Sequence, residues 1–190
     1  MEITIIGGVP CTGKTTLMRK IKTELLINKK LDDQDMNILK GYQDKKKENV
    51  IFGLYEGDLF DGTDKLSMAV QPQAIDWLHK ADTKIKNVFI EGDRLFKPSF
   101  IKACKNITSR VRIIVLEAGQ ETLDYRHATR KDEQSKEWLI AKKTTVDNIK
   151  KEFPCHIFSN QNLNDQDIIL NYILSNEYYK CVNPAQRTLF

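Results

Sequence analysis

The sequence has few cysteines and histidines and no long apolar run. It contains four cysteines and three histidines in 190 residues, with no C-x-x-C pair. This pattern argues against a disulfide framework or a zinc-type cluster and favours a reducing compartment. The apolar run at residues 3–6 is far too short to cross a membrane, and no secretory signal is visible. We therefore expect a cytoplasmic protein with no membrane partner.

Internal repeats and low-complexity segments are also absent, and the composition is ordinary. Apolar residues make up 41% and charged residues 29% of the chain, which is typical of a globular protein. The length suits one domain with a substantial core. A net charge of +4 permits an anionic partner, either a nucleotide or nucleic acid, without requiring one.

One motif stands out near the start of the chain. Residues 8–15 read GVPCTGKT and fit G-x-x-x-x-G-K-[ST], a phosphate-binding loop between a strand and a helix. The glycines let successive N–H groups point at one spot, and the helix adds its positive N-terminal end. In this arrangement Lys14 reaches the β- and γ-phosphates and the Thr15 hydroxyl holds Mg²⁺. The alternative, a Gly-rich turn without a ligand, is disfavoured by the full match.

The loop therefore predicts a nucleoside triphosphate, ATP or GTP, as ligand. The residues expected to bind it are Gly8, Val9, Pro10, Cys11, Thr12, Gly13, Lys14, Thr15 and Thr16.

Strand and helix patterns alternate along the rest of the chain. β-Branched and apolar runs predict strands at 2–7, 36–39, 50–55, 88–90, 111–116 and 156–158. Helical periodicity predicts helices at 14–28, 66–82, 98–107, 121–130, 133–153 and 167–174, with polar loops at 29–34 and 43–49. We expect an α/β, P-loop NTPase three-layer fold: a parallel sheet of about five strands with helices on both faces. A single domain would cover 1–190, with a lid-like helical segment at about 120–150.

In parallel sheets, ligands bind at the carboxyl ends of the strands. That rule places the phosphate loop, the acidic loop 56–64 and the turn 91–94 on one rim. Glu91 ends an apolar strand, where an acid that binds Mg²⁺ is expected, and Asp93 is the competing candidate. The predicted metal residues are thus Thr15, Glu91 and Asp93, unless the two acids only favour a helix N-terminus.

The loop 56–64 carries four carboxylates close to a site for a polyanion. One use for them is a general base that orients an acceptor hydroxyl. Asp58 is the first candidate and Asp61 the second. The alternative is that Asp61 and Asp64 are turn residues.

Two arginines lie four residues apart on a late helix. Arg126 and Arg130 therefore share a helix face and could clamp transferring phosphates, or they are solvated surface residues. With Lys14, Asp58 and Asp61 they complete the predicted catalytic set. The lysine run 45–47 is either a solvated turn or a nucleic-acid contact.

In order along the chain, the phosphate loop, the sequence EGDR at 91–94 and the arginine pair resemble small P-loop kinases acting on nucleosides and nucleotides. The resemblance implies that the loop after the last strand, 160–165, borders the adenine. No standard acceptor signature of thymidylate or adenylate kinases is present. Residues 60–68 are similar to small kinase-like proteins of bacteriophages, some of which phosphorylate hydroxymethyluracil in DNA; a viral chain would work in the host cytoplasm.

The sequence thus predicts an ATP- and Mg²⁺-dependent kinase whose acceptor is a hydroxyl or phosphate on a nucleoside, a nucleotide or a modified base in DNA. Two alternatives stay open: an NTPase that hydrolyses ATP or GTP to drive a partner, and a nucleic-acid-binding module regulated by nucleotide. The choice of acceptor, a homodimer and the role of residues 176–190 also stay open.

Overall fold

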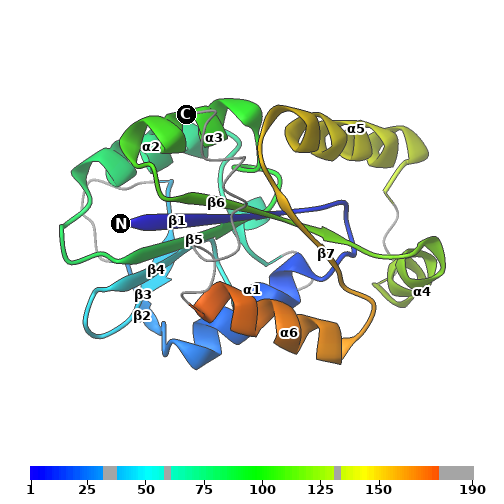
Figure 1. The fold of residues 1–190 in the computed structure, drawn as a ribbon, viewed down its shortest axis with the longest axis horizontal. Coiled ribbons are helices and arrows are strands. Elements are labelled where there is room, and N and C mark those ends of the chain that lie inside the picture. The colour runs from blue at the N-terminus through cyan, green and yellow to red at the C-terminus, as the bar shows by residue number, and fades with distance from the viewer. Residues whose placement is uncertain (32–37, 58–60, 131–133, 176–190) are drawn as a thin grey trace.

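The computed structural model describes residues 1–31, 38–57, 61–130 and 134–175. The strands of these residues form one sheet (Figure 1) and are β1 Glu2–Gly7, β2 Lys29–Lys30, β3 Gly41–Gln43, β4 Asn49–Phe52, β5 Asn87–Glu91, β6 Val111–Glu117 and β7 His156–Ser159. The helices are α1 Lys14–Glu24, the short 3₁₀ helix η1 Thr63–Lys65, α2 Val70–Lys80, α3 Pro98–Ile107, α4 Gln120–Arg130, α5 Lys136–Glu152 and α6 Leu163–Leu174.

The sheet order is β2-β3-β4-β5-β1-β6-β7. The five strands from β4 to β7 in this order are parallel, which confirms the predicted α/β fold. β1 lies between β5 and β6, with Ile3 opposite both Val88 and Val111. The loop after β1 therefore leaves the carboxyl rim at the middle of the sheet.

Two further strands were not predicted, so the sheet is mixed at one edge. β2 and β3 pair antiparallel to each other, and β3 pairs antiparallel to β4. The predicted loops at 29–34 and 43–49 were therefore wrong in part, because Lys29–Lys30 and Gly41–Gln43 are strands. Of the predicted strand at 36–39, residues 36 and 37 lie outside the described residues, and Ile38 and Leu39 are in no strand.

A tight turn explains why the polar stretch after β3 is compatible with a hairpin. The Asp44 carboxylate accepts hydrogen bonds from the N–H groups of Glu48 (2.8 Å) and Asn49 (3.2 Å), as Asp does in turns. The lysines 45–47 are exposed at this turn. Since Asn49 pairs with Asn87 where β1 begins, the lysine run lies on the amino rim, opposite the phosphate loop.

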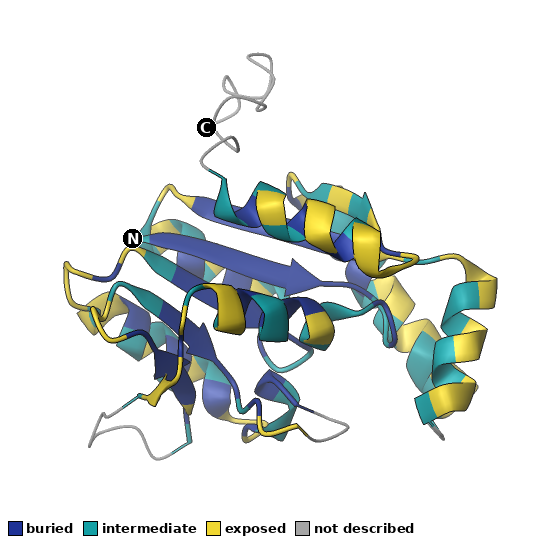
Figure 2. Ribbon diagram, turned by 90° about the horizontal axis from the view of Figure 1, so that it is seen from below, coloured by how far each residue is buried: buried dark blue, intermediate teal, exposed yellow. Residues whose placement is uncertain are grey.

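Helices cover both faces of the sheet. In Figure 1, α2, α3 and α5 lie above it and α1 and α6 below it. Neighbouring residues of β1 alternate between the faces: Ile5 belongs to the upper core and Ile6 to the lower one. The upper core includes Val88, Ile113, Phe100 and Ile149, and the lower core includes Phe89, Ile114, Leu17 and Ile169. Figure 2 shows β1 buried along its length, as expected for a central parallel strand.

The lid-like segment differs from the other helices. α4 buries no residue, while α5 contributes Val146 and Ile149 to the core. Ser135 caps α5 by accepting a hydrogen bond from the Trp138 N–H (3.2 Å). The helix predicted at 66–82 is shorter, and Pro72 falls in the first turn of α2, where proline is tolerated. No helix in the described ranges is long and apolar enough to span a membrane.

Two glycines after β4 provide a matched test of the turn that carries the acidic loop. Gly53 (φ 108°) and Gly57 (φ 98°) both have positive φ, but a Cβ on Gly53 would lie 2.4 Å from the Gly62 carbonyl carbon, whereas one on Gly57 meets nothing within 4 Å. We expect Gly57→Ala to lower the free energy of unfolding by about 1 kcal/mol. Gly53→Ala should cost about 1–3 kcal/mol more. Urea unfolding of both variants measures the difference, and equal losses would contradict the packing described.

Candidate active site

The phosphate loop curls where β1 ends and α1 begins. Gly13 has φ 89° and stands at the N-cap of α1, and a Cβ there would lie 2.4 Å from Asn160 Nδ2. The buried Thr12 donates its hydroxyl to the Val9 carbonyl (2.8 Å). Asn160 Nδ2 donates to the Thr12 carbonyl (2.7 Å). The loop is therefore held from outside by the segment that follows β7.

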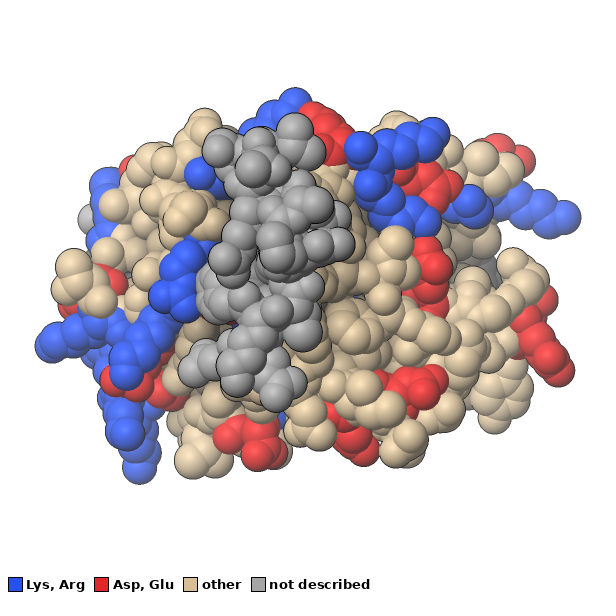
Figure 3. Space-filling model, in the orientation of Figure 1, with Lys and Arg blue, Asp and Glu red and all other residues tan. Residues whose placement is uncertain are grey.

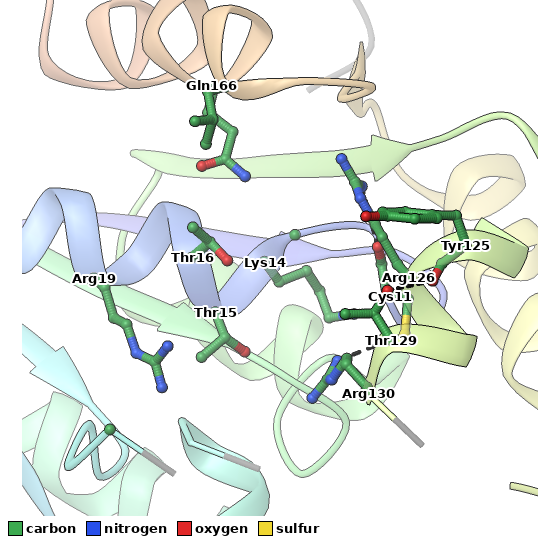
Figure 4. A pocket seen from close by; sticks show the side chains of 13 residues that line it. Cys11, Lys14, Thr15, Thr16, Arg19, Tyr125, Arg126, Thr129, Arg130 and Gln166 are labelled. Carbon is green, nitrogen blue, oxygen red and sulfur yellow. Dashed lines mark hydrogen bonds between the residues drawn. The ribbon is translucent and has the colours of Figure 1, made fainter. Parts of the chain in front are cut away.

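Lys14 and Thr15 occupy the positions that the motif predicts. Lys14 Nζ donates to the carbonyls of Gly8 and Val9, at 2.9 Å each. Figure 4 shows its side chain reaching from α1 toward Arg130 and Cys11. Thr15 Oγ1 lies 3.3 Å from Glu91 Oε1. Two of the three predicted metal residues thus come together where α1 begins and β5 ends.

Glu91 is a buried carboxyl at the end of β5. It is 2% exposed and also accepts a hydrogen bond from the Tyr55 hydroxyl (3.3 Å). Burial raises the pKa of Glu91 to about 7, with repulsion from Asp64 adding to the rise and the nearby Lys14 opposing it. A cation placed beside this carboxyl would favour its ionised form.

The oxygen pair of Thr15 and Glu91 fits Mg²⁺ bound together with a nucleotide. Mg²⁺ takes oxygen ligands, keeps several waters and uses one or two carboxylates plus substrate phosphates. No group of three or more His, Cys, Asp or Glu side chains in the described ranges could hold an ion alone. Asp93, the competing candidate, forms an ion pair with Lys142 (2.9 Å), which favours Glu91 as the direct ligand.

The acidic loop contributes differently from what the sequence predicts. Asp58, the first candidate for the base, lies outside the described residues. Asp61 is buried, with its carboxylate paired to Arg19 and Lys65 and bonded to the Gly57 N–H (2.9 Å). Burial acts to raise the pKa of Asp61, but these hydrogen bonds outweigh it and lower the pKa to about 2. Through these contacts, Asp61 stabilises the conformation of the acidic loop.

Asp61 and Asp64 both line the narrow gap beside the phosphate loop, but of these two only Asp64 also lines the third cavity. The gap is also lined by Lys14, Thr15 and Glu91. The Asp64 Oδ1 accepts a hydrogen bond from the Asp93 N–H (3.1 Å). Burial and the negative charge of Asp93 raise the pKa of Asp64, while Lys14 opposes the rise.

The two predicted arginines lie over the phosphate loop but have different partners. Arg126 donates to three backbone carbonyls, those of Cys11 (3.1 Å), Asn160 (3.0 Å) and Gln161 (3.0 Å). It therefore ties α4 to the loop. Arg130 Nη1 lies 3.6 Å from Cys11 Sγ, and its side chain lines both the first cavity and the gap beside Glu91. Figure 4 shows the two guanidinium groups on either side of Cys11.

Three hollows follow one another across this rim. The first, of about 460 Å³, includes Lys14, Thr16, Tyr125 and Arg130 in its lining. The second is a gap of about 50 Å³ that shares Cys11, Lys14, Thr15 and Arg130 with the first. The third, of about 530 Å³, shares Asp64, Asp93, Gln134 and Trp138 with the gap. The outer two have the size of ligand sites and the gap does not.

Sequence reasoning missed several residues of this rim. Asn160 directly follows β7, and this position at the rim was the signal available for it. Trp138 and Gln134 belong to the lid segment and carry no motif. Asp64 was named as one of four acids, with a turn residue as the alternative, but it was not a candidate for the base.

The raised pKa of Glu91 predicts a pH dependence of stability without metal or nucleotide. The folded state binds this proton more tightly than the unfolded chain, so the free energy of unfolding should fall as pH rises from about 4.5 to about 7. The loss should reach roughly 3 kcal/mol at most. Glu91→Gln should remove this slope, while Glu121→Gln, at an exposed position, should keep it. Urea unfolding in EDTA at several pH values measures the slopes, and parallel curves for wild type and Glu91→Gln would contradict the assignment.

Comparison with solved structures finds proteins of similar fold. The chain resembles a gluconokinase from Sinorhizobium meliloti 1021 with a TM-score of 0.53 and 10% identity, covering 95% of this chain and 98% of that one. A sugar kinase from Janibacter sp. HTCC2649 (TM-score 0.48, 10% identity, 92% of each chain) and a deoxyadenosine kinase from M. mycoides (0.46, 14%, 91% of this chain and 98% of that one) are also similar. A comparison with curated protein sequences found no match.

The sequence model of one family covers most of the chain. The family described as P-loop Nucleotide Kinase3 matches residues 2–162, a range that runs from β1 into the loop after β7 and includes the phosphate loop, Glu91 and Arg130. The chain therefore belongs to the P-loop Nucleotide Kinase3 family and is a P-loop kinase.

Proposed function

We propose that the chain transfers the γ-phosphoryl group of ATP, with Mg²⁺, to a hydroxyl or phosphate group of a nucleoside, a nucleotide or a modified base in DNA. The observation that carries this proposal is the narrow gap between two ligand-sized cavities. Lys14, Thr15 and Arg130 line its side toward the first cavity, and Asp64 and Asp93 are shared with the third. A transferring group needs such a meeting point, while a hydrolase or a regulatory nucleotide site needs only the first cavity.

The first cavity suits the donor. The amides of the phosphate loop and Lys14 would hold the phosphates, and the N-terminus of α1 adds its positive dipole end. When bound at Thr15 and Glu91, Mg²⁺ would neutralise charge that develops on the phosphate oxygens. The exposed side chains of Tyr125 and Leu163 (73% and 67%) line the outer part of the same cavity, which supports a nucleobase between α4 and α6.

Arg130 and Arg126 of α4 would have different roles in phosphoryl transfer. Arg130 lines the gap and can stabilise charge on the transferring group, as arginines do in phosphoryl transfer. Arg126 donates its hydrogen bonds to three backbone carbonyls. It would instead position α4 and the phosphate loop. We therefore propose that Arg130 alone contacts the transferring phosphate, and that Arg126 holds α4 in place for it.

Asp64 is the acid that the geometry favours for orienting the acceptor. It lines both the gap and the third cavity, whereas Asp61 already has Arg19, Lys65 and a backbone N–H as partners. A carboxylate at this point can accept the hydrogen bond of an incoming hydroxyl and take its proton. The proposal therefore prefers Asp64 to Asp61.

A modified base in DNA, such as hydroxymethyluracil, is one of the proposed acceptors. The likeness of residues 60–68 to bacteriophage kinases supports it. If DNA binds, the lysines of α5 rather than those at 45–47 are on its path, because Lys142 lines the third cavity. Lysine and arginine side chains gather both over α5 and in the lower left of Figure 3, near β2 and β3. Lys142 of α5 lines the third cavity, whereas none of the lysines 45–47 does.

Replacing Lys14 tests the donor half of the proposal. Lys14→Ala should lower kcat for label transfer from γ-labelled ATP by about 10²–10³-fold or more, since the main positive charge at the γ-phosphate is lost. Lys20→Ala, on the same helix but paired with Asp167 (2.6 Å), should leave kcat within about two-fold. Circular dichroism checks that both variants stay folded.

Full turnover in folded Lys14→Ala would overturn the proposal. Release of inorganic phosphate at one rate with every acceptor tested would favour the NTPase alternative.

The two arginines should separate in kinetics and stability. Arg130→Ala should lower kcat by about 100-fold or more and leave the unfolding midpoint in urea nearly unchanged. Arg126→Ala should lower the free energy of unfolding by about 2 kcal/mol, because three backbone carbonyls lose their hydrogen-bond donor. It should also raise KM for ATP. These roles would be contradicted if Arg130→Ala lost stability but kept full kcat. They would also be contradicted if Arg126→Ala kept full stability but lost kcat.

A further inference from the structure

We propose that the third cavity binds the acceptor as an uncharged nucleobase-bearing group that stacks on Trp138 and presents a hydroxyl, not a phosphate, to the gap. The acceptor cavity is defined by Asp64, Asp93, Arg94, Gln134, Trp138 and Lys142. This inference rests on the proposed function and names the chemistry of its acceptor.

The position of the acceptor cavity follows from the residues that it shares with the gap. Asp64, Asp93, Gln134 and Trp138 line both. A ligand in the acceptor cavity is therefore separated from the phosphate loop by the width of the gap alone. At about 530 Å³ the cavity can enclose a molecule of nucleoside size.

Trp138 is the feature that indicates an aromatic ligand. It lies on the first turn of α5 and is half-buried. Lys142 Nζ lies 5.0 Å from the centre of its ring, and no aromatic side chain in the described part of the chain stacks on it. A tryptophan ring that lines a cavity binds a nucleobase by stacking, which discriminates little between bases.

The charges of the acceptor cavity disfavour a phosphate. Its two cations already have protein partners: Lys142 is paired with Asp93 (2.9 Å), and Arg94 donates to the carbonyls of Leu66 (3.3 Å) and Asp64 (3.4 Å). Two carboxylates balance them. A phosphate dianion is normally bound by free guanidinium or ammonium groups and would here meet Asp64 and Asp93. An uncharged hydroxyl has no such conflict.

A hydrogen-bond acceptor is also available for the base. Gln134 Oε1 is buried and has no hydrogen-bond partner among the described residues. A base N–H or amino group can supply the missing donor, since a buried unpaired carbonyl oxygen costs free energy. Trp138 and Gln134 would thus hold the ring while Asp64 faces the hydroxyl.

In the proposed transfer step, each bond that forms is matched by one that breaks, and Asp64 accepts the proton. The acceptor oxygen forms its bond to the γ-phosphorus while the bond from that phosphorus to the β–γ bridging oxygen breaks. The bridging oxygen leaves on ADP, and the hydroxyl proton passes to the Asp64 carboxylate. The same chemistry serves a free nucleoside and a hydroxyl-bearing base in single-stranded DNA.

Binding can be measured without turnover, through the fluorescence of Trp138. The chain has two tryptophans. Trp77 is partly buried and packs edge-on against Phe52 of the upper core, so Trp77→Phe leaves Trp138 as the sole reporter. Titration should include deoxyadenosine and 5-hydroxymethyldeoxyuridine, their 5′-monophosphates, gluconate, and a single-stranded oligonucleotide with hydroxymethyluracil. If Trp77→Phe does not fold, the difference between wild type and Trp138→Phe gives the same signal.

We expect saturable quenching by nucleosides at concentrations about ten-fold or more below those needed for monophosphates. Tighter binding of the oligonucleotide than of the nucleosides would support the same site with DNA as the source. Tighter binding of a monophosphate or of gluconate, or no quenching by any compound, would overturn the inference.

Kinetics provide the second readout. Loss of stacking should raise the acceptor KM of Trp138→Leu by about five-fold to 150-fold, with KM for ATP within about two-fold. Trp138→Phe should restore much of the loss, and Glu137→Gln, exposed beside it, should change neither constant. An unchanged acceptor KM in Trp138→Leu would contradict the stacking role. Nucleoside quenching without any phosphoryl transfer would instead refute the proposed function and leave this binding site standing.

Discussion

The hydrogen bond from Asn160 Nδ2 to the Thr12 carbonyl (2.7 Å) is the contact on which the site depends most. Asn160 is fully buried at the end of β7, and its own carbonyl accepts from Arg126 (3.0 Å). Its backbone N–H donates to the Glu117 carbonyl at the end of β6 (2.8 Å). One residue thus connects the phosphate loop, two strand ends and helix α4. The curl of the loop is fixed by distant parts of the chain as much as by its glycines.

The chemistry of the rim depends on a buried acid in a low-dielectric setting. Glu91 is held between Thr15 and Tyr55, and its ionisation is costly until a cation lies beside it. Metal and nucleotide would therefore relieve an unfavourable charge, which couples their binding to the protein's stability. The first cavity, the gap and the third cavity lie in sequence on this rim, so under the proposed function one set of side chains would serve both binding and transfer.

The amino-acid sequence predicted the parallel sheet and the phosphate loop because both have local signals: β-branched runs, helical periodicity and an eight-residue motif. The edge strands β2 and β3 escaped prediction, since Lys29–Lys30 and Gly41–Gln43 are short and owe their structure to pairing. The meeting of Thr15 with Glu91 followed from the rule for strand ends. The contacts of Asp61 and Asp64 did not, because they involve Arg19 of α1 and Asp93 after β5, which are distant in the sequence, as well as Lys65, four residues after Asp61.

The central claim is that donor and acceptor bind on opposite sides of one gap. It is tested most directly by a bisubstrate compound in which adenosine is joined to a nucleoside by a polyphosphate chain. Simultaneous occupation of both cavities should make it bind about 100-fold or more tightly than ATP, as measured by calorimetry, with most of the gain lost in Trp138→Leu. Affinity equal to that of ATP, unchanged by that substitution, would contradict the claim.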